Sequence, residues 1–512
     1  RALEHGLKNA PVREIMEAGE ITLTPADSIF ALEQIIVDSG WGQIPVMQDG
    51  KLSGIVTRTD LIKHWARTHP SPAAVTPATN LTPEQIQTVL GEATARLIQA
   101  LAEQAQTARV NLYLVGGVVR DLLLKRPNFD IDFVVEQDAI VFAQRIQQAY
   151  GGEISTHPAF RTAKWHLTEA CAAQFGDNLP TTIDFATARN EFYEHPTALP
   201  TVYTGSIKLD LQRRDFTINT LAVQLSPGAG RVLDFYGGLN DLQAGMMRVL
   251  HSLSFVDDPT RILRAVRFAQ RLNFQIEART ADLISTSREM LRRITGERVR
   301  NELTLLLHEA EPERGLLDLQ ARGALAAIHP ALRFSEAMAT PLPQARDADL
   351  MTQWHGAKFV QPDLYWHLWL AQLAPAEVNA IGERLLIAKG ERDSIHAAAV
   401  LLHQPERLAE TGIKPSQVVT RLEGLPEIAL LTVWLLTANP VTQAYIQQYL
   451  STWRHIRPIT TGHTLKALGL PPGPLYRSVL DRLRIARLNG EIQTDAEETA
   501  LLQTLITGDT PS

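Results

Sequence analysis

The sequence predicts an α+β protein in which a small module precedes a mixed α/β part and a long helical part. Between residues 110 and 250, short apolar runs typical of strands alternate with helical patterns. After residue 258 the strand pattern stops, and amphipathic segments broken by Pro and Gly follow one another. Residues 12–66 carry a helix, a hairpin and a closing helix of their own.

Length and composition limit the classes of protein. The 512 residues are enough for several domains, and the 45% hydrophobic content is that of a globular protein. No run of ~18 apolar residues occurs, so we expect no membrane span. The single cysteine, Cys171, excludes an internal disulfide and a cysteine zinc cluster, which fits a reducing cytoplasm. The chain begins at Arg1 without an initiator Met or a signal-peptide pattern, so we expect it to be part of a longer protein.

The net charge of −7 argues only weakly against a nucleic-acid partner, because binding depends on where basic residues gather. Two clusters exist, one with Arg261, Arg264, Arg267 and Arg271, the other with Arg288, Arg292, Arg293, Arg298 and Arg300. For the second cluster a solvated helix face is an equal alternative to a phosphate-binding surface.

The module at residues 12–66 is predicted in order from its apolar pattern. A helix carries Ile29, Leu32, Ile35 and Ile36, and two short strands meet at Asp49-Gly50, a pair typical of a hairpin turn. The closing helix opens at 59–62. A Pro-rich linker follows at 68–82, and then one helix at 83–106, with Thr82 as N-cap and Pro83 first.

The segment 112–135 carries the strongest chemical pattern. An apolar run ends at Gly116-Gly117, a short helix follows, and a second apolar run carries Asp130 and Asp132. Residues i and i+2 of a strand share a face, so both carboxylates are expected to project together. They repel unless a cation lies between them, and a pair of divalent metals ~4 Å apart needs such a platform for displacement at phosphorus. The Gly pair lets the backbone approach a triphosphate, and the helix N–H groups favour its charge.

Two later segments could complete this site. Asp184, on an expected strand at 182–189, could form a carboxylate triad with the first pair, or be only solvated or paired with Arg189. Arg214 offers planar donors suited to phosphate, and Asp215 or Asn219 could bond a ribose hydroxyl. The alternative is a helix N-terminus with Asp215 at its dipole. The Gly-rich segment 234–242 indicates only a loop.

The segment 257–268 is the most informative of the helical part. Asp258 and Pro259 are expected as N-cap and first helical residue, and Arg261, Arg264 and Arg267 recur along one face. These arginines repel one another unless an anion lies against them, and a nucleotide would supply one. Asp258 and Arg261 offer an acceptor and a fork of donors that can match the Watson–Crick edges of adenine and cytosine. The alternative is an exposed capped helix with a weak surface ion pair.

With these motifs in order, residues 110–310 resemble the head and neck of a class II tRNA nucleotidyltransferase, the CCA-adding or bacterial poly(A) polymerase family. Residues 459–475 resemble that family's tail, residues 12–66 resemble a cystathionine-β-synthase (CBS) module, and residues 1–7 resemble the closing helix of a preceding module. The resemblance implies a polymerase-β-type head with a small mixed sheet. The implied domains are the CBS module 1–68, linker and helix 69–108, head 109–252, neck 253–330, body 331–455 and tRNA-binding tail 456–512.

The resemblance also implies roles for individual residues. Asp130 and Asp132 would bind two Mg²⁺ ions, with Asp184 as a third catalytic carboxylate. Asp258 and Arg261 would read the incoming base. The other nucleotide-binding residues would be Gly116, Gly117, Arg120, Arg214, Asp215, Asn219, Arg264 and Arg267. Substrates would be ATP, with CTP left open, and the acceptor stem and 3′ end of tRNA.

The implied reaction is attack of the tRNA 3′-hydroxyl on the α-phosphate, adding the terminal A or the whole CCA. A CBS module ahead of the head favours A addition and allows a homodimer through that module. Two other functions stay open, namely a poly(A) polymerase and an adenylate-sensing CBS regulator with a non-catalytic head. Two residues depart from the family pattern: Asp257 stands where the family has Glu, and Arg161 replaces a Gly, which removes backbone freedom from its loop.

Overall fold

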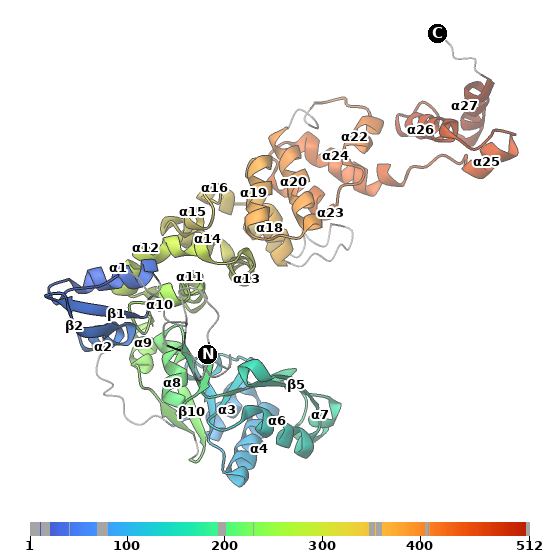
Figure 1. The fold of residues 1–512 in the computed structure, drawn as a ribbon. Helices are drawn as coiled ribbons and strands as arrows, with labels where there is room; N and C mark the ends of the chain where they lie inside the picture. Colours follow the sequence, from blue (N-terminus) through green and yellow to red (C-terminus); the bar gives the residue numbers. More distant parts are fainter. Residues whose placement is uncertain are drawn as a thin grey trace. The chain divides into compact units, whose positions relative to one another are not determined.

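The computed structural model describes residues 11, 21–39, 41–68, 80–192, 201–228, 230–347, 354, 361–404, 408 and 410–507 (Figure 1). Two compact units divide the chain, Arg1–Ile294 and Thr295–Ser512. The helix expected at residues 1–7 and most of the expected linker lie outside the described residues. Within the part that is described, every helix is too short or too polar to cross a bilayer.

The N-terminal module has the predicted hairpin and both helices. Its elements are α1 (Ile29–Ser39), β1 (Gln43–Gln48), β2 (Lys51–Thr57) and α2 (Arg58–Thr68). The strands pair antiparallel, and the turn places Asp49 and Gly50 at φ 51° and 72°, which Asp and Gly tolerate better than other residues. The hairpin therefore forms where the turn residues predicted it.

The single helix expected at residues 83–106 is wrong, because Gly91 divides it. Gly91 has φ 84° and separates α3 (Pro83–Leu90) from α4 (Glu92–Ala108). The predicted start is confirmed: Thr82 accepts a bond from the Gln85 N–H, and the Gln85 side chain accepts one from the Thr82 N–H.

A seven-stranded mixed sheet forms the centre of the first unit, in the order β11-β10-β3-β4-β7-β6-β5. Its strands are β3 (Leu112–Val115), β4 (Ile131–Val135), β5 (Glu153–His157), β6 (Thr162–His166), β7 (Thr182–Thr187), β10 (Ala222–Ser226) and β11 (Arg231–Leu233). β4 and β7 run parallel, and the other neighbours run antiparallel. A separate ladder joins β8 (Arg189–Phe192) to β9 (Thr201–Thr204).

The alternation of side chains on β4 and β7 explains why one face is a core and the other is free for chemistry. Phe133 and Phe185 are buried and stack at 5.5 Å between ring centroids, and Phe142 of α6 (Ala139–Tyr150) packs edge-on against Phe185. The preceding residues of these strands, Asp132 and Asp184, point to the opposite face. The helices of this part are α5 (Gly117–Leu123), α6 (Ala139–Tyr150), α7 (Glu169–Phe175), α8 (Ile207–Gln212) and α9 (Gly238–Ala244), with the 3₁₀ turns η2 (Pro158–Phe160) and η3 (Thr217–Asn219).

The first unit ends in a helical segment, which we call the neck. It contains α10 (Ser254–Asp257), α11 (Thr260–Leu272), α12 (Ala278–Ser287) and the 3₁₀ helix η4 (Arg288–Arg293). The expectation that strands stop at residue 258 is wrong in one detail, because the short β13 (Gln275–Ile276) pairs in parallel with β12 (Met246–Met247).

In the second unit the described residues form helices and no strand, as predicted (Figure 1). They are α13 (Gly296–Leu307), α14 (Pro312–Ala321), α15 (Ala324–Ile328), α16 (Glu336–Ala339), η5 (Leu342–Arg346), α18 (Gln361–Leu370), α19 (Pro375–Arg384), α20 (Lys389–His403), α22 (Pro415–Leu422), α23 (Glu427–Leu436), α24 (Pro440–Ser451), η6 (Trp453–His455), α25 (Gly462–Ala467), α26 (Pro474–Leu488) and α27 (Asp495–Thr507). Predicted helical segments such as 392–403 and 428–436 fall inside α20 and α23.

Candidate active site

Three carboxylates meet at the free face of β4 and β7. The parallel register places Asp132 directly beside Asp184, and Asp130 comes immediately before β4 rather than within it. One carboxylate oxygen from each residue lies within 4.8 Å of the others. The three residues therefore form the acidic triad that the sequence suggested.

Burial and neighbouring negative charge both raise the pKa of Asp132. Desolvation and the neighbouring Asp130 raise the pKa of Asp132 to about 6, and Asp184 adds to this, while Arg214 and Lys164 oppose it. A site where negative charge is this strongly disfavoured without a cation suits a divalent metal, and carboxylate oxygens are the ligands that Mg²⁺ prefers.

Lys164 is a site residue that the sequence did not suggest. Its ammonium lies 2.8 Å from the Asp184 carboxylate, because the β6–β7 register places the two residues opposite each other. The alternative pairing of Asp184 with Arg189 is wrong, since Asp184 pairs with Lys164 and the Arg189 guanidinium donates to the Phe160 carbonyl at 2.9 Å. Only the strand register could have revealed this lysine.

A cavity of about 250 Å³ opens over the triad. Its lining includes Asp132, Asp184 and Arg214. Gly116, at φ +77°, lies close to two of these residues: an added Cβ would lie 2.7 Å from Arg214 Nη1 and 3.9 Å from Asp132 Oδ2. At Gly117 an added Cβ would meet only ordinary contacts at 3.5 Å or more. Of the two glycines, only Gly116 is thus needed for the close approach of the Arg214 side chain to the backbone.

Arg120 lies beneath the surface and links several of the suggested residues. Its side chain is 2% exposed and donates to both carboxylate oxygens of Asp121 and to Asn219 Oδ1, each at 2.8 Å. Asn219 in turn donates to Asp215 Oδ1 at 2.9 Å. The predicted contact of Arg120 with a triphosphate stays a prediction, and in this structure its guanidinium joins α5 to η3.

Asp215 connects that chain of bonds to α11. Its Oδ2 accepts from Arg264 Nε and Nη2 at 2.9 and 2.6 Å. Burial alone would raise the pKa of Asp215, but Arg264 and Asn219 lower it to about 2. The sequence predicted that an anion lies against the arginines of this helix. For Arg264 that anion is the Asp215 carboxylate of the same chain. Arg267 lies over the Phe268 ring at 4.5 Å.

The suggested base-reading pair lies at the start of α11. The helix begins at Thr260, one residue later than predicted, and Asp258 Oδ1 accepts from the N–H and hydroxyl of Thr260 at 3.1 and 2.6 Å. Arg261 is buried and donates to Ser254 Oγ and to the Arg213 carbonyl, each at 2.8 Å. Both side chains are therefore held by α10 and its neighbours.

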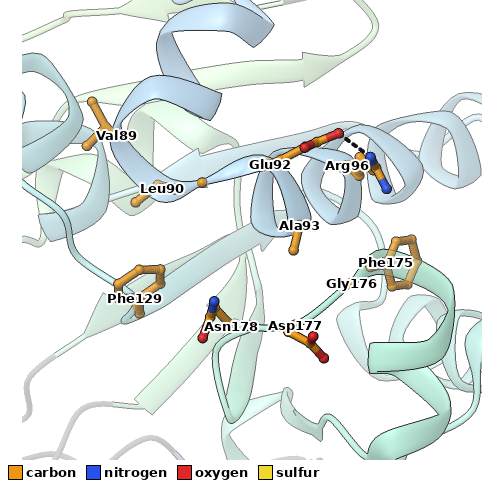
Figure 2. Close-up of a pocket in the computed structure, with 11 residues that line it drawn as sticks. Val89, Leu90, Glu92, Ala93, Arg96, Phe129, Phe175, Gly176, Asp177 and Asn178 are labelled. Atoms are coloured by element: carbon orange, nitrogen blue, oxygen red, sulfur yellow. Dashed lines mark hydrogen bonds and ion pairs between the residues drawn. The ribbon is translucent and has the colours of Figure 1, made fainter.

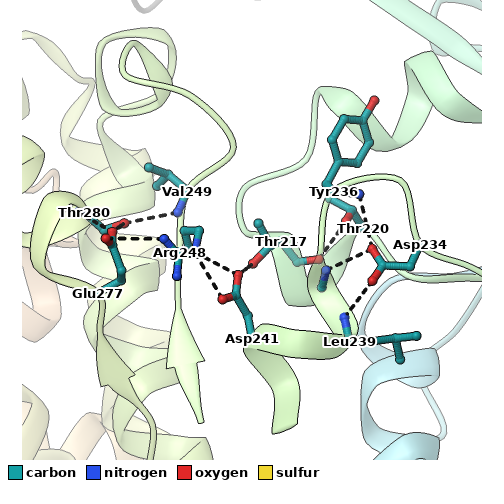
Figure 3. Close-up of polar contacts among 11 residues, drawn as sticks. Thr217, Thr220, Asp234, Tyr236, Leu239, Asp241, Arg248, Val249, Glu277 and Thr280 are labelled. Carbon is teal, nitrogen blue, oxygen red and sulfur yellow. Dashed lines mark hydrogen bonds and ion pairs between the residues drawn. The ribbon is translucent and has the colours of Figure 1, made fainter. Parts of the chain in front are cut away.

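A network of polar contacts joins η3 to α9 and to the segment that carries Arg248 (Figure 3). Asp241 accepts from the Thr217 hydroxyl at 2.6 Å and from Arg248, which also pairs with Glu277 at 3.3 Å. The segment 234–242, expected to be only a loop, opens α9 because Asp234 accepts from the N–H groups of Gly238 and Leu239 at 2.9 Å.

A larger cavity of about 430 Å³ lies between the start of α4 and the loop after α7 (Figure 2). Phe129, Phe175 and Asn178 line it, and its Glu92 is already paired with Arg96. Among the described residues, the group that could hold a metal is the triad at the smaller cavity. Chemistry therefore favours the smaller cavity over the larger one.

Comparison with known proteins matches three regions of the chain. Residues 112–248 match the Poly A polymerase head domain, residues 273–335 the probable RNA- and SrmB-binding site of polymerase A, and residues 12–67 the CBS domain. An A-adding tRNA nucleotidyltransferase from Halalkalibacterium halodurans is 33% identical, over 78% of this chain and 89% of that protein. The chain belongs to the tRNA nucleotidyltransferase family.

Other members of the tRNA nucleotidyltransferase family extend the likeness. An A-adding tRNA nucleotidyltransferase from Geobacter sulfurreducens is 35% identical over 97% of this chain, which spans 58% of that relative's length. A CCA-adding enzyme solved in complex with ATP is 27% identical, with a TM-score of 0.69 over 85% of this chain and 100% of that one. The family and the polymerase-type head with its CBS module, both suggested by resemblance, are confirmed.

The departure from the family pattern at Arg161 has a structural consequence. Arg161 adopts φ 51° and ψ 45°, a left-handed conformation that Gly reaches at little cost and other residues do not. Its carbonyl accepts from the Thr187 N–H at 3.1 Å, which ties the strained turn to the end of β7. The loop therefore keeps a backbone shape suited to Gly even though Arg occupies it.

Proposed function

We propose that this chain is a template-independent tRNA nucleotidyltransferase that transfers AMP from ATP to the 3′ end of tRNA. The observation that carries the proposal is the acidic triad beside Arg214 and Gly116, in a chain whose relatives are named for this reaction. The partly buried Asp132, whose charge is disfavoured, supports binding of a divalent cation.

Asp130 and Asp132 would hold Mg²⁺, taken as two ions, which supplies Lewis-acid stabilisation of charge at the reacting phosphate. Asp184 contributes the third carboxylate and Arg214 faces the phosphates across the cavity. Gly116 leaves room for the close approach of the triphosphate. Arg120, Gly117, Asn219, Asp215, Arg264 and Arg267 would shape the nucleotide pocket, either by direct contact or through the chain of bonds described above.

Base choice is assigned to Asp258 and Arg261, whose acceptor and donors lie together at the start of α11. We further propose residues 253–330 as the part that reads the nucleotide and residues 456–512 as a tRNA-binding tail. We also propose a cytoplasmic location, because the single cysteine fits a reducing compartment. These assignments rest on the resemblance and on the placement of the two side chains.

The experiment that tests the proposal offers three tRNAs, ending at the discriminator base, at C or at CC, each with ATP or CTP alone. An A-adding enzyme incorporates only AMP and only on the CC end. CMP on the two shorter tRNAs together with AMP on the CC end would indicate full CCA addition, and long A tails on unrelated RNA would indicate a poly(A) polymerase. No incorporation on any RNA would overturn the proposal.

We propose in addition that two copies associate through the CBS module. Leu52 and Ile55 on β2 are 61% and 57% exposed, and Phe30 on α1 is 68% exposed, and a second module could cover these apolar side chains. Sedimentation of the whole chain at increasing concentration tests this, and a mass that stays monomeric would contradict it.

A further inference from the structure

The CBS module and the neck share one hydrophobic core. A single buried cluster includes Leu32, Ile36, Ile44 and Leu61 of the module and Leu253, Val256 and Met290 of the neck. Leu253 immediately precedes α10, the four-residue helix that ends at Asp257, and Val256 lies within it. The module is therefore packed directly against the element that precedes the base-reading segment.

Polar contacts hold the same helix from the module side. The Arg58 guanidinium, at the start of α2, forms an ion pair with Asp257, and both side chains are largely buried at 20% and 8% exposed. Burial raises the pKa of Glu33 on α1, and the Ser252 side chain just before α10 partly offsets this. His251, 3.8 Å from Asp257, has its pKa lowered to about 3 by burial, Arg261 and Arg58, so it stays neutral. The charge that Asp257 faces comes from Arg58.

α10 in turn holds both members of the base-reading pair. Asp258 follows Asp257 directly, and its N–H bonds the Ser254 carbonyl at 3.3 Å. The Ser254 hydroxyl accepts from Arg261 Nη1 at 2.8 Å. A shift of this short helix would therefore move an acceptor and a donor of the pair together.

We propose that Arg58 of the CBS module is a positioning residue for base selection, acting through Asp257 and α10 on Asp258 and Arg261. The inference rests on the base-reading role proposed above for those two residues. It gives the module a part in the reaction itself: the module sets the position of the surface that distinguishes one nucleotide base from another.

The test measures kcat and KM for ATP and for CTP with the full chain and tRNA ending in CC. Arg58→Ala is expected to raise KM for ATP and lower the ATP-over-CTP preference by roughly tenfold, within the range of energetic coupling between sites. Arg58→Lys, which keeps the charge, should restore most of that preference. Arg67→Ala is the matched control, because Arg67 is an exposed arginine on the same helix.

Asp257→Asn is a second route to the same contact, and combining it with Arg58→Ala should change the preference no further than either variant alone. Unchanged preference in both Arg58→Ala and Asp257→Asn would overturn the inference. Asp258→Asn separates the two proposals: if it lowers the preference while Arg58→Ala and Asp257→Asn do not, only the present inference fails. If Asp258→Asn also leaves the preference unchanged, the proposed base-reading role fails and this inference fails with it.

Discussion

At the acidic triad, Asp132 is held where its negative charge is disfavoured. Burial and the charge of Asp130 both oppose its ionised form. Its folded-state pKa of about 6 lies above the ordinary value of 3.8, so the folded protein keeps a proton that the unfolded chain releases. Stability without metal is therefore expected to fall as pH rises from about 4 to about 6.

Asp132→Asn removes that unfavourable charge. At pH 8 without metal it is expected to raise the free energy of unfolding by about 1–3 kcal/mol, since burial of the ionised carboxylate no longer opposes folding. The same substitution should abolish the stabilisation that Mg²⁺ gives the wild type, together with nucleotide incorporation. Urea unfolding with and without Mg²⁺ measures both effects, and a variant that Mg²⁺ stabilises as strongly as the wild type would contradict the assignment.

A substitution at Gly116 tests whether the close approach of Arg214 to the backbone matters for activity. Gly116→Ala would place a Cβ against the Arg214 guanidinium, so displacement of Arg214 is expected to lower kcat/KM by ~10²-fold. Gly91→Ala is the matched control, because Gly91 has a similar φ of 84° but no atom within 4 Å of the added Cβ. Equal losses of activity in the two variants would show that backbone strain, not the clash, is responsible.

Among the elements, the connection between η3 and α11 depends on one buried carboxylate. Asp215 has a folded-state pKa of about 2, below the ordinary 3.8, so it stabilises the fold above about pH 4 and loses this contribution as pH falls toward about 2. Asp215→Asn leaves the Arg264 charge without its partner and should lower the free energy of unfolding at pH 7 by about 3 kcal/mol.

Between pH 4 and pH 2 the free energy of unfolding of the wild type should fall as Asp215 is protonated. In the Asp215→Asn variant this fall should be smaller. Glu92→Gln is the control, because the exposed Glu92–Arg96 pair on α4 contributes little. Circular dichroism against urea and pH measures both variants. A loss in Asp215→Asn no larger than in Glu92→Gln would contradict the role given to Asp215.

Sequence patterns predicted elements well where the signal is local. The Asp-Gly turn, the Thr82 cap and the strand carrying Asp132 all depend on residues close together in the chain. What the sequence could not supply is register between distant segments. Lys164 becomes a partner of Asp184 only through the β6–β7 pairing, and Arg120 meets Asn219, 99 residues further along the chain, only in the folded protein. Gly91 could have indicated a break, but an isolated Gly in a helical pattern is often tolerated.

On the scale of the whole molecule, the first unit joins a CBS module to the nucleotidyltransferase part through a common core. Ile44 is fully buried in that core. Ile44→Ala is therefore expected to lower the free energy of unfolding by about 2–5 kcal/mol and to reduce hydrogen-exchange protection in α10 as well as in the module.

Leu52→Ala provides the comparison for Ile44→Ala, because Leu52 lies on the same hairpin but is 61% exposed and should change stability by less than about 0.5 kcal/mol. If Ile44→Ala reduces protection in the module and leaves α10 unchanged, the two parts do not share a core in solution.

The central claim is that the acidic triad of Asp130, Asp132 and Asp184 holds a divalent cation at the α-phosphate of ATP. The most direct measurement compares incorporation from the two diastereomers of ATP carrying sulfur at that phosphate, in Mg²⁺ and in the more thiophilic Mn²⁺. The account predicts that one diastereomer reacts slowly in Mg²⁺ and recovers in Mn²⁺, and that Asp132→Asn reacts in neither. Equal rates for both diastereomers in both metals would contradict it.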